Sequence, residues 1–474
     1  MPTMFAFGIG QAAEGFQANA FNVFLLFYYQ QIIGISGSLA GLALGIGLFF
    51  DAISDPAAGV LSDRFSSRWG RRHPFIFFSA FPLFITFVAL FNPPAELSEF
   101  GNFLWLTLFA VLVRGALTFH YIPHLALGAD MAQDYNQRST LFALSSVFAI
   151  TAMSVVSIVG YGYFFPTTEE FNPGILNSEA YFGFSITIAI AMFVVIMICC
   201  FGTAKEIPFL HQGRNTQVLS RKWVLTVYKQ VFSNKSFQVI FAGMVLSTFA
   251  ISVEAILSPF MGIHFWGLRT EQLAVIPLAT IAGLWIGLPI SPWLTRLLDK
   301  RLALVIPAIF ITVNNNAALV LRLMDVSWFP GNESPWIFWI LFARYLLLGM
   351  ALPVVLASFN SMFADIADEI ELKTGERREG VIYSARSFAN KTATALGAIL
   401  GGVLLDLIRF PSNAAAGTVP LDVVWWLGLT EGPILSIASM VGVLFYLRYK
   451  ITRDGHRQIM EAIALRKPQD KVQA

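Results

Sequence analysis

Apolar runs of about 20 residues recur along the entire chain, and no long polar domain separates them. A run of that length crosses roughly 30 Å of hydrocarbon as an α-helix. The composition agrees, because 56% of the residues are hydrophobic and only 13% are charged, outside the usual range of soluble globular domains. The chain is therefore expected to be an integral membrane protein in direct contact with the lipid bilayer.

Twelve such runs can be counted, so the sequence predicts an all-α membrane protein with twelve transmembrane helices. Charged blocks and loops rich in Pro, Gly and Asn separate the runs. They lie near residues 5–33, 37–62, 74–92, 101–128, 139–165, 181–203, 236–262, 270–295, 302–323, 335–360, 380–408 and 423–448.

Lysine and arginine are distributed unequally between the two sets of loops. If the N-terminus is cytoplasmic, the loops on that side carry most of the basic residues, and the opposite loops carry mainly acids. Because positively charged loops stay in the cytoplasm, both termini are predicted to be cytoplasmic. The basic residues are then explained by topology, and the net charge of +2 indicates no nucleic-acid partner.

The chain is predicted to divide into two halves of six helices. The longest cytoplasmic segment before the tail follows the sixth run and carries six basic residues, and Arg114 and Arg344 each stand nine residues before a proline, as in a repeat. Two such halves describe the major facilitator architecture, whose site lies at the midplane between them. The expected parts are an N-terminal six-helix bundle at 1–203, a cytoplasmic central loop at 204–235, a C-terminal six-helix bundle at 236–448 and a cytoplasmic tail at 449–474.

Ionisable residues inside the apolar runs indicate a functional site, because hydrocarbon makes them costly. Asp51 and Asp55 in the second run are four residues apart, so a helix places them on one face, about one turn from each other. Two such carboxylates must face a cavity, pair with a positive group or take up a proton. A structural pair that holds helices together is one interpretation. We favour a binding site for Na⁺ or H⁺, since hard cations prefer oxygen ligands.

Other polar residues inside the runs have open interpretations. Thr118 could add a hydroxyl oxygen to the cation site. Lys391 lies midway along the eleventh run, where it could act as a counter-charge when the cation leaves, or it could extend to the membrane surface. Arg114 could pair with Glu14 or cap backbone carbonyls, in a packing or gating role, and Arg344 is interpreted in the same way. The histidines that flank Pro123 have no third ligand within sequence reach, so no transition-metal site is expected.

An arginine-rich turn follows the second run. It could simply anchor the topology, or it could pair with acids between runs ten and eleven and close the cytoplasmic side. We favour this cytoplasmic gate. Its predicted members are Asp63, Arg64, Arg68, Arg71, Arg72, Asp365, Asp368 and Glu371.

Three motifs appear in order along the chain. The first runs from Asp51 to Pro74 and combines the aspartate pair with Asp-Arg and Arg-Trp-Gly-Arg-Arg; the others are YIPHLALGADMAQDYNQRSTL at 121–141 and FADIADEIELKTGERREGVIYSARSFANKTATALG at 363–397. In this combination they resemble the glycoside-pentoside-hexuronide:cation symporter family over essentially the whole chain. The resemblance implies the major facilitator fold and symport by alternating access. It also implies that the aspartate pair coordinates Na⁺, H⁺ or Li⁺, with a threonine at position 118 nearby and a coupling lysine at position 391.

The substrate positions match the melibiose-type members of that family less well. Acidic positions on helices one and four of those members fall here at Gly15 and Tyr121, and a helix-eleven glutamine falls at Arg386. Because sugar selectivity depends on hydrogen bonds to hydroxyls, a different polar set is expected, and Arg386 would suit an anionic uronide. The predicted substrate-binding residues are Glu14, Gln17, Asn22, Tyr121 and Arg386.

The sequence thus predicts a monomeric symporter of the bacterial inner membrane that couples inward movement of Na⁺ or H⁺ to uptake of a glycoside, uronide or other sugar-derived solute. No cofactor is expected besides the coupling ion. Related animal proteins suggest the alternative, a cation-coupled transporter of lysophospholipids or other amphiphiles. A receptor or scaffold that kept the fold is a third hypothesis. An enzyme is not expected, because no phosphate-binding glycine loop, nucleophile constellation or metal cluster is apparent.

Overall fold

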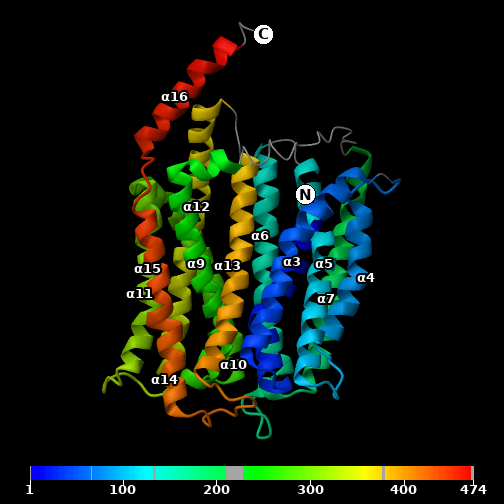
Figure 1. The fold of residues 1–474 in the computed structure, drawn as a ribbon, viewed down its shortest axis with the longest axis vertical. Helices are drawn as coiled ribbons and strands as arrows, with labels where there is room; N and C mark the ends of the chain where they lie inside the picture. The colour runs from blue at the N-terminus through cyan, green and yellow to red at the C-terminus, as the bar shows by residue number, and fades with distance from the viewer. Residues whose placement is uncertain (1, 66, 132–134, 210–227, 376–378, 471–474) are drawn as a thin grey trace. The chain divides into compact units, whose positions relative to one another are not determined.

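The computed structural model describes residues 2–65, 67–131, 135–209, 228–375 and 379–470, and no β-strand occurs among them. Eleven helical segments in this part of the chain are long and apolar enough to cross a membrane (Figure 1). The all-α prediction is therefore confirmed. Much of the predicted central loop falls on residues 210–227, which lie outside the described residues.

Each predicted run after the first contains one spanning helix. Short π-helical turns continue α6 and α9 and join α14 to α15. The bounds are α3 Gly37–Arg64, α4 His73–Leu90, α5 Glu99–Met131, α6 Tyr135–Val159, α7 Ala180–Thr203, α9 Lys235–Phe260, α10 Thr270–Leu297, α11 Lys300–Leu323, α12 Trp336–Thr374, α13 Glu379–Leu407, α14 Leu421–Leu429 and α15 Leu435–Tyr446.

The first run is also helical but is not one continuous α-helix. It consists of α1 Pro2–Gly10, α2 Ala12–Asn19 and the π-helical segments η1 Ala20–Leu25 and η2 Tyr28–Ile33. It ends at Gly34, whose φ of 82° is readily adopted only by glycine. Single π-helical turns are frequent at functional sites, so the broken first run is a reasonable position for ligand-binding residues.

Two compact units can be distinguished. Unit 1 comprises Met1–Thr216, Ser252–Pro277 and Thr394–Leu427, and unit 2 comprises Gln217–Ile251, Leu278–Ala393 and Gly428–Ala474. Two segments of the predicted C-terminal half, 252–277 and 394–427, therefore belong to unit 1. The division into two six-helix halves stays a prediction.

In unit 1, α3 packs along α5, and α4 packs against both α5 and α7. Buried aromatic side chains pack between the first run and α7 in this unit. The rings of Tyr28 and Tyr181 are 4.3 Å apart between centroids, and those of Phe24 and Phe184 are 4.9 Å apart. Such pairs add about 0.5–1.5 kcal/mol each beyond the burial of their area, so this cluster helps to hold the first run against α7.

The start of α3 is held closely against the end of α13. The Asp406 carboxylate accepts hydrogen bonds from the backbone N–H groups of Gly37 at 2.8 Å and Ser38 at 2.7 Å. An acid at a helix N-terminus satisfies otherwise unpaired donors and complements the helix dipole. A Cβ on Gly402 would lie only 2.0 Å from the Gly37 carbonyl oxygen, so this close approach requires glycine at position 402.

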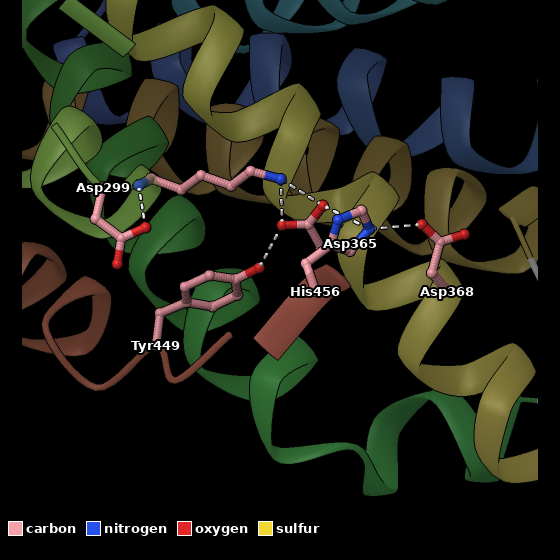
Figure 2. Close-up of polar contacts among 6 residues, drawn as sticks. Asp299, Asp365, Asp368, Tyr449 and His456 are labelled. Atoms are coloured by element: carbon pink, nitrogen blue, oxygen red, sulfur yellow. Dashed lines mark hydrogen bonds and ion pairs between the residues drawn. The ribbon is translucent and has the colours of Figure 1, made fainter. Parts of the chain in front are cut away.

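Unit 2 has an apolar core and a buried ionic cluster at one end of its helices. Phe237, Phe363 and Tyr446 belong to the core. In the cluster, Lys300 Nζ donates to both carboxylate oxygens of Asp365 at 2.7 Å, and the Tyr449 hydroxyl donates to Asp365 at 3.2 Å (Figure 2). Burial, and next the charge of Asp365, raises the pKa of the Tyr449 hydroxyl, so this hydroxyl remains a donor.

The helix α16, Arg453–Asp470, is attached to the same ionic cluster. His456 Nε2 lies 3.0 Å from Asp368 Oδ2 and 3.4 Å from Asp365 Oδ1 (Figure 2). Arg453 donates to the carbonyl oxygens of Thr295 and Arg296, both at 3.1 Å. The first turn of α16 is therefore fixed to the ends of α10 and α12.

Lys300 is expected to stabilise unit 2 more than a lysine in an exposed ion pair. Lys300→Met leaves the Asp365 side chain, 3% exposed, without its lysine, and removing one partner of a buried pair costs about 3 kcal/mol. Lys373→Met is the matched control, because Lys373 is 57% exposed and its pair with Glu369 contributes about 0.5 kcal/mol. Thermal unfolding of the purified protein should show a clear fall only for Lys300→Met. Equal falls would contradict this assignment.

A second stability prediction concerns the glycine contact in unit 1. Gly402→Ala should destabilise the protein by about 1–3 kcal/mol, because the added methyl group meets a backbone carbonyl. Gly380→Ala at the start of the same helix is the control: a Cβ there meets nothing within 4 Å, and alanine favours a helix over glycine by at most about 1 kcal/mol. Thermal unfolding of both variants should show a lower unfolding temperature for Gly402→Ala and an equal or higher one for Gly380→Ala. A stabilised Gly402→Ala variant would show that the two helices are not in close contact.

Candidate functional site

Asp51, Asp55 and Thr118, which the sequence assigns to the cation site, lie close together between α3 and α5. The Thr118 hydroxyl donates to Asp55 Oδ1 at 3.1 Å, and the Ser54 hydroxyl lies 3.3 Å from that of Thr118. Asp51 is buried and Asp55 is half-buried. The two carboxylates therefore stand one turn apart on the face of α3 that meets α5.

Arg114 contacts Asp51. This pairing was not predicted from the sequence. Arg114 Nη1 donates to Asp51 Oδ2 at 2.6 Å, and both side chains are nearly buried. Arg114 and Thr118 are four residues apart on α5, the same spacing as Asp51 and Asp55 on α3. Equal spacings on two adjacent helices allow both pairs of side chains to meet. The shared four-residue spacing was therefore the sequence signal for a contact between Arg114 and Asp51.

Lys391 belongs to a different compact unit from these carboxylates. It lies on α13 in unit 2 and is half-buried, whereas Asp51 and Asp55 lie in unit 1. Its proposed action as a counter-charge stays a prediction.

Four of the predicted substrate-binding residues lie in unit 1. Glu14 on α2 accepts a hydrogen bond from the Gln11 amide, and Gln17 on the same helix is buried. Asn22 in η1 and Tyr121 on α5 are half-buried. The broken first run thus supplies three of these four polar groups.

Arg386, the fifth predicted substrate residue, lies on α13 in unit 2. It donates to Asn360 Oδ1 at 2.8 Å, and its guanidinium lies over the Phe363 ring, 5.0 Å from the centroid. A guanidinium in this setting keeps other N–H donors for an anionic group.

Two buried histidines on α5 serve as hydrogen-bond tethers to α1. His120 Nε2 donates to the Gly10 carbonyl oxygen at 2.9 Å, and His124 Nε2 donates to that of Phe7 at 2.8 Å. No group of three or more His, Cys, Asp or Glu side chains that could hold a metal ion is found in the described ranges.

The predicted gate arginines Arg71 and Arg72 contact acids of unit 1. Arg71 Nη2 donates to both carboxylate oxygens of Asp130, at 2.9 and 3.0 Å, and Arg72 lies 2.5 Å from Asp63. Asp130 was not among the predicted members, although it lies in the second motif of the sequence. Its acidic character at the end of α5 was the available signal.

The predicted acids on the other side of the gate belong to unit 2. Asp365 and Asp368 are held in the cluster with Lys300 and His456, and Glu371 is half-buried on α12. The remaining predicted arginines, Arg64 and Arg68, are exposed in unit 1. Pairing between the two sets stays a prediction.

Comparison with known proteins shows similarity along the whole chain. A putative glycoside/cation symporter of Escherichia coli (strain K12) is 23% identical, with 90% of this chain and 86% of the relative covered. A glucuronide carrier protein homolog of the same strain is 23% identical, with 87% and 84% covered. The inward-facing, unoccupied crystal structure of a bacterial homolog to the human lysosomal transporter Spinster matches with a TM-score of 0.65, at 12% identity and 97% coverage of both chains, and supports the fold alone.

The family described as MFS/sugar transport protein matches residues 6–453 of this chain. This range includes the spanning helices and the residues between α3 and α5. The resemblance to the glycoside-pentoside-hexuronide:cation symporters is confirmed, and the enzyme interpretation is excluded. The chain belongs to the MFS/sugar transport protein family and is a multi-pass membrane transporter of the major facilitator type.

Proposed function

We propose that this chain is a symporter that couples inward movement of Na⁺ or H⁺ to uptake of a glycoside, uronide or other sugar-derived solute by alternating access. The observation that carries the proposal is the carboxylate pair, Asp51 and Asp55, inside a membrane-spanning helix of a transporter family. Carboxylates at that depth are costly and mark ion pathways. The names of the relatives, a putative glycoside/cation symporter and a glucuronide carrier homolog, support the same class.

The coupling mechanism follows from the charge of this site. We propose that a cation that binds at Asp51 and Asp55 reduces the repulsion between the carboxylates and thereby raises the affinity for the substrate, with Lys391 as the predicted coupling residue. Coupling of this kind is reciprocal, so the substrate raises the affinity for the cation by the same factor. The net direction of transport then depends on the combined gradients of the cation and the substrate.

The proposed substrate class rests on the polar set of the first run and on Arg386. Glu14, Gln17 and Asn22 offer side-chain donors and acceptors for hydroxyl groups. The Arg386 guanidinium adds a permanent positive charge, which favours a carboxylate on the sugar. Among sugar-derived solutes, a uronide is therefore the preferred candidate. We further propose that the protein acts as a monomer in a bacterial inner membrane with both termini in the cytoplasm.

Asp55→Asn should abolish cation-stimulated uptake while leaving a folded protein in the membrane. The amide keeps the size of the side chain and can still bond to Thr118 but removes the charge that holds the cation. Uptake by proteoliposomes under an imposed Na⁺ or pH gradient measures the effect, and Asp422→Asn, at an exposed acid of α14, is the control. Gradient-driven uptake at the wild-type rate in Asp55→Asn would refute the site.

Arg386→Gln should reduce binding of a uronide about 10- to 100-fold, the usual loss for a hydrogen bond between charged groups. Binding of the matching neutral glycoside should change little, because it has no carboxylate. Competition binding with both ligands checks this, and Arg457→Gln, at a 74% exposed side chain, is the control. If neutral glycosides compete in the wild type and uronides do not, the anionic-substrate assignment fails.

A further inference from the structure

The contacts between α3 and α5 form two rungs of different chemistry. In the first rung, the Arg114 guanidinium donates to the Asp51 carboxylate at 2.6 Å. In the second, the Thr118 hydroxyl donates to the Asp55 carboxylate at 3.1 Å. Each rung joins the same two helices, one turn apart. The carboxylate pair therefore already contains one permanent cation, supplied by the protein itself.

Several contacts hold the Arg114 side chain in the first rung. Its side chain passes over Gly47, one turn before Asp51, where a Cβ would lie 3.2 Å from Arg114 Cδ. Its guanidinium lies 5.2 Å from the centroid of the Phe21 ring, at a distance that allows a cation–π interaction. Both Arg114 and Asp51 are nearly shielded from solvent, with side chains 13% and 10% exposed. The Arg114 side chain is thus held by contacts with a glycine, an aromatic ring and a carboxylate.

The Arg114 guanidinium disfavours a metal cation in this arrangement. Na⁺ and Li⁺ need several oxygen ligands at once, and the guanidinium already occupies Asp51 Oδ2, one of the oxygens that would coordinate them. The other oxygens near the pair belong to the Asp55 carboxylate, to Asp51 Oδ1 and to the hydroxyls of Thr118 and Ser54. A cation between Asp51 and Asp55 would also lie within a few ångströms of the positive charge of Arg114, which repels it. The summed formal charge of the four rung residues is −1, compared with −2 for the two aspartates alone.

We propose that Arg114 is a tethered cation that excludes Na⁺ and Li⁺ from the carboxylate pair and so determines the ion selectivity of the site. This inference rests on the proposed function and narrows it, since it removes metal ions from the possible coupling ions. Of the two ions proposed above, only H⁺ binds to a carboxylate without several coordinating oxygen ligands, so H⁺ is the expected coupling ion. Arg114 acts on the site through its contact with Asp51 and is assigned no contact with the substrate.

Na⁺ binding to the purified full-length protein tests the proposal without any substrate. Thermal unfolding is followed in NaCl and in choline chloride at equal ionic strength, up to about 100 mM, a hundredfold excess over a millimolar dissociation constant. The wild type should unfold at the same temperature in both salts. Arg114→Gln should gain a saturable stabilisation by Na⁺, with a midpoint at least tenfold lower than any in the wild type.

Two further variants separate the charge from the shape of the side chain. Arg114→Lys keeps the charge and should behave as the wild type. The double variant Arg114→Gln with Asp51→Asn also removes the charge of the Asp51 carboxylate and should lose the gained Na⁺ response. Saturable Na⁺ stabilisation of the wild type or of Arg114→Lys, or its absence from a folded Arg114→Gln, would overturn the proposal. If Arg114→Gln does not fold, the Na⁺ titrations of the wild type and of Arg114→Lys test the proposal, and saturable Na⁺ stabilisation of either protein overturns it.

The result is independent of the proposed symport. Uptake that ignores both Na⁺ and pH gradients would overturn the proposed function, yet the binding comparison would still show whether Arg114 excludes Na⁺. Conversely, saturable Na⁺ binding by the wild type together with Na⁺-driven uptake would support symport and overturn the role of Arg114.

Discussion

The free-energy cost of a charge without a partner in hydrocarbon governs the polar interior of this protein. Few ionisable residues occur inside the spanning helices, and the structure places several of them in contact with groups of complementary charge or hydrogen-bonding capacity. The pair of Asp51 with Arg114 is the clearest case, because both side chains are nearly buried. Around it, helices α3 and α5 must remain close enough for direct contact, which orients the neighbouring Asp55 and Thr118.

The same constraint operates in unit 2, with a different result. There, Asp365 is satisfied by Lys300 and Tyr449 at the ends of the helices, and His456 connects this cluster to α16. A carboxylate with several fixed partners is well suited to hold helix ends in place. Asp55 is half-buried and accepts a hydrogen bond from the neutral Thr118 hydroxyl, so its surroundings differ from those of Asp365.

Close contact between helices depends on small residues as well as on charge. Gly402 and Gly37 allow backbones to approach, and Asp406 satisfies the first donors of α3. Gly47 similarly makes room for the side chain of Arg114. Gly37 begins a four-residue repeat of glycines with Gly41 and Gly45, a pattern that indicates close packing of one helix against another. The residues alone do not show which helix lies opposite, so the contact with Gly402 could not have been predicted from them.

The sequence by itself determined the class of fold and the family, because twenty-residue apolar runs have few stable alternatives to membrane-spanning helices and the three motifs are specific. It also predicted a cation site at Asp51, Asp55 and Thr118, since helical spacing places the two carboxylates on one face, and the structure places Thr118 in contact with Asp55. Only the tertiary structure assigned Arg114 to Asp51 and Asp130 to Arg71, and placed Asp365 between Lys300 and Tyr449. The reason is physical: spacing along a helix fixes which side chains share a face, but the partner across the interface depends on how two helices are packed.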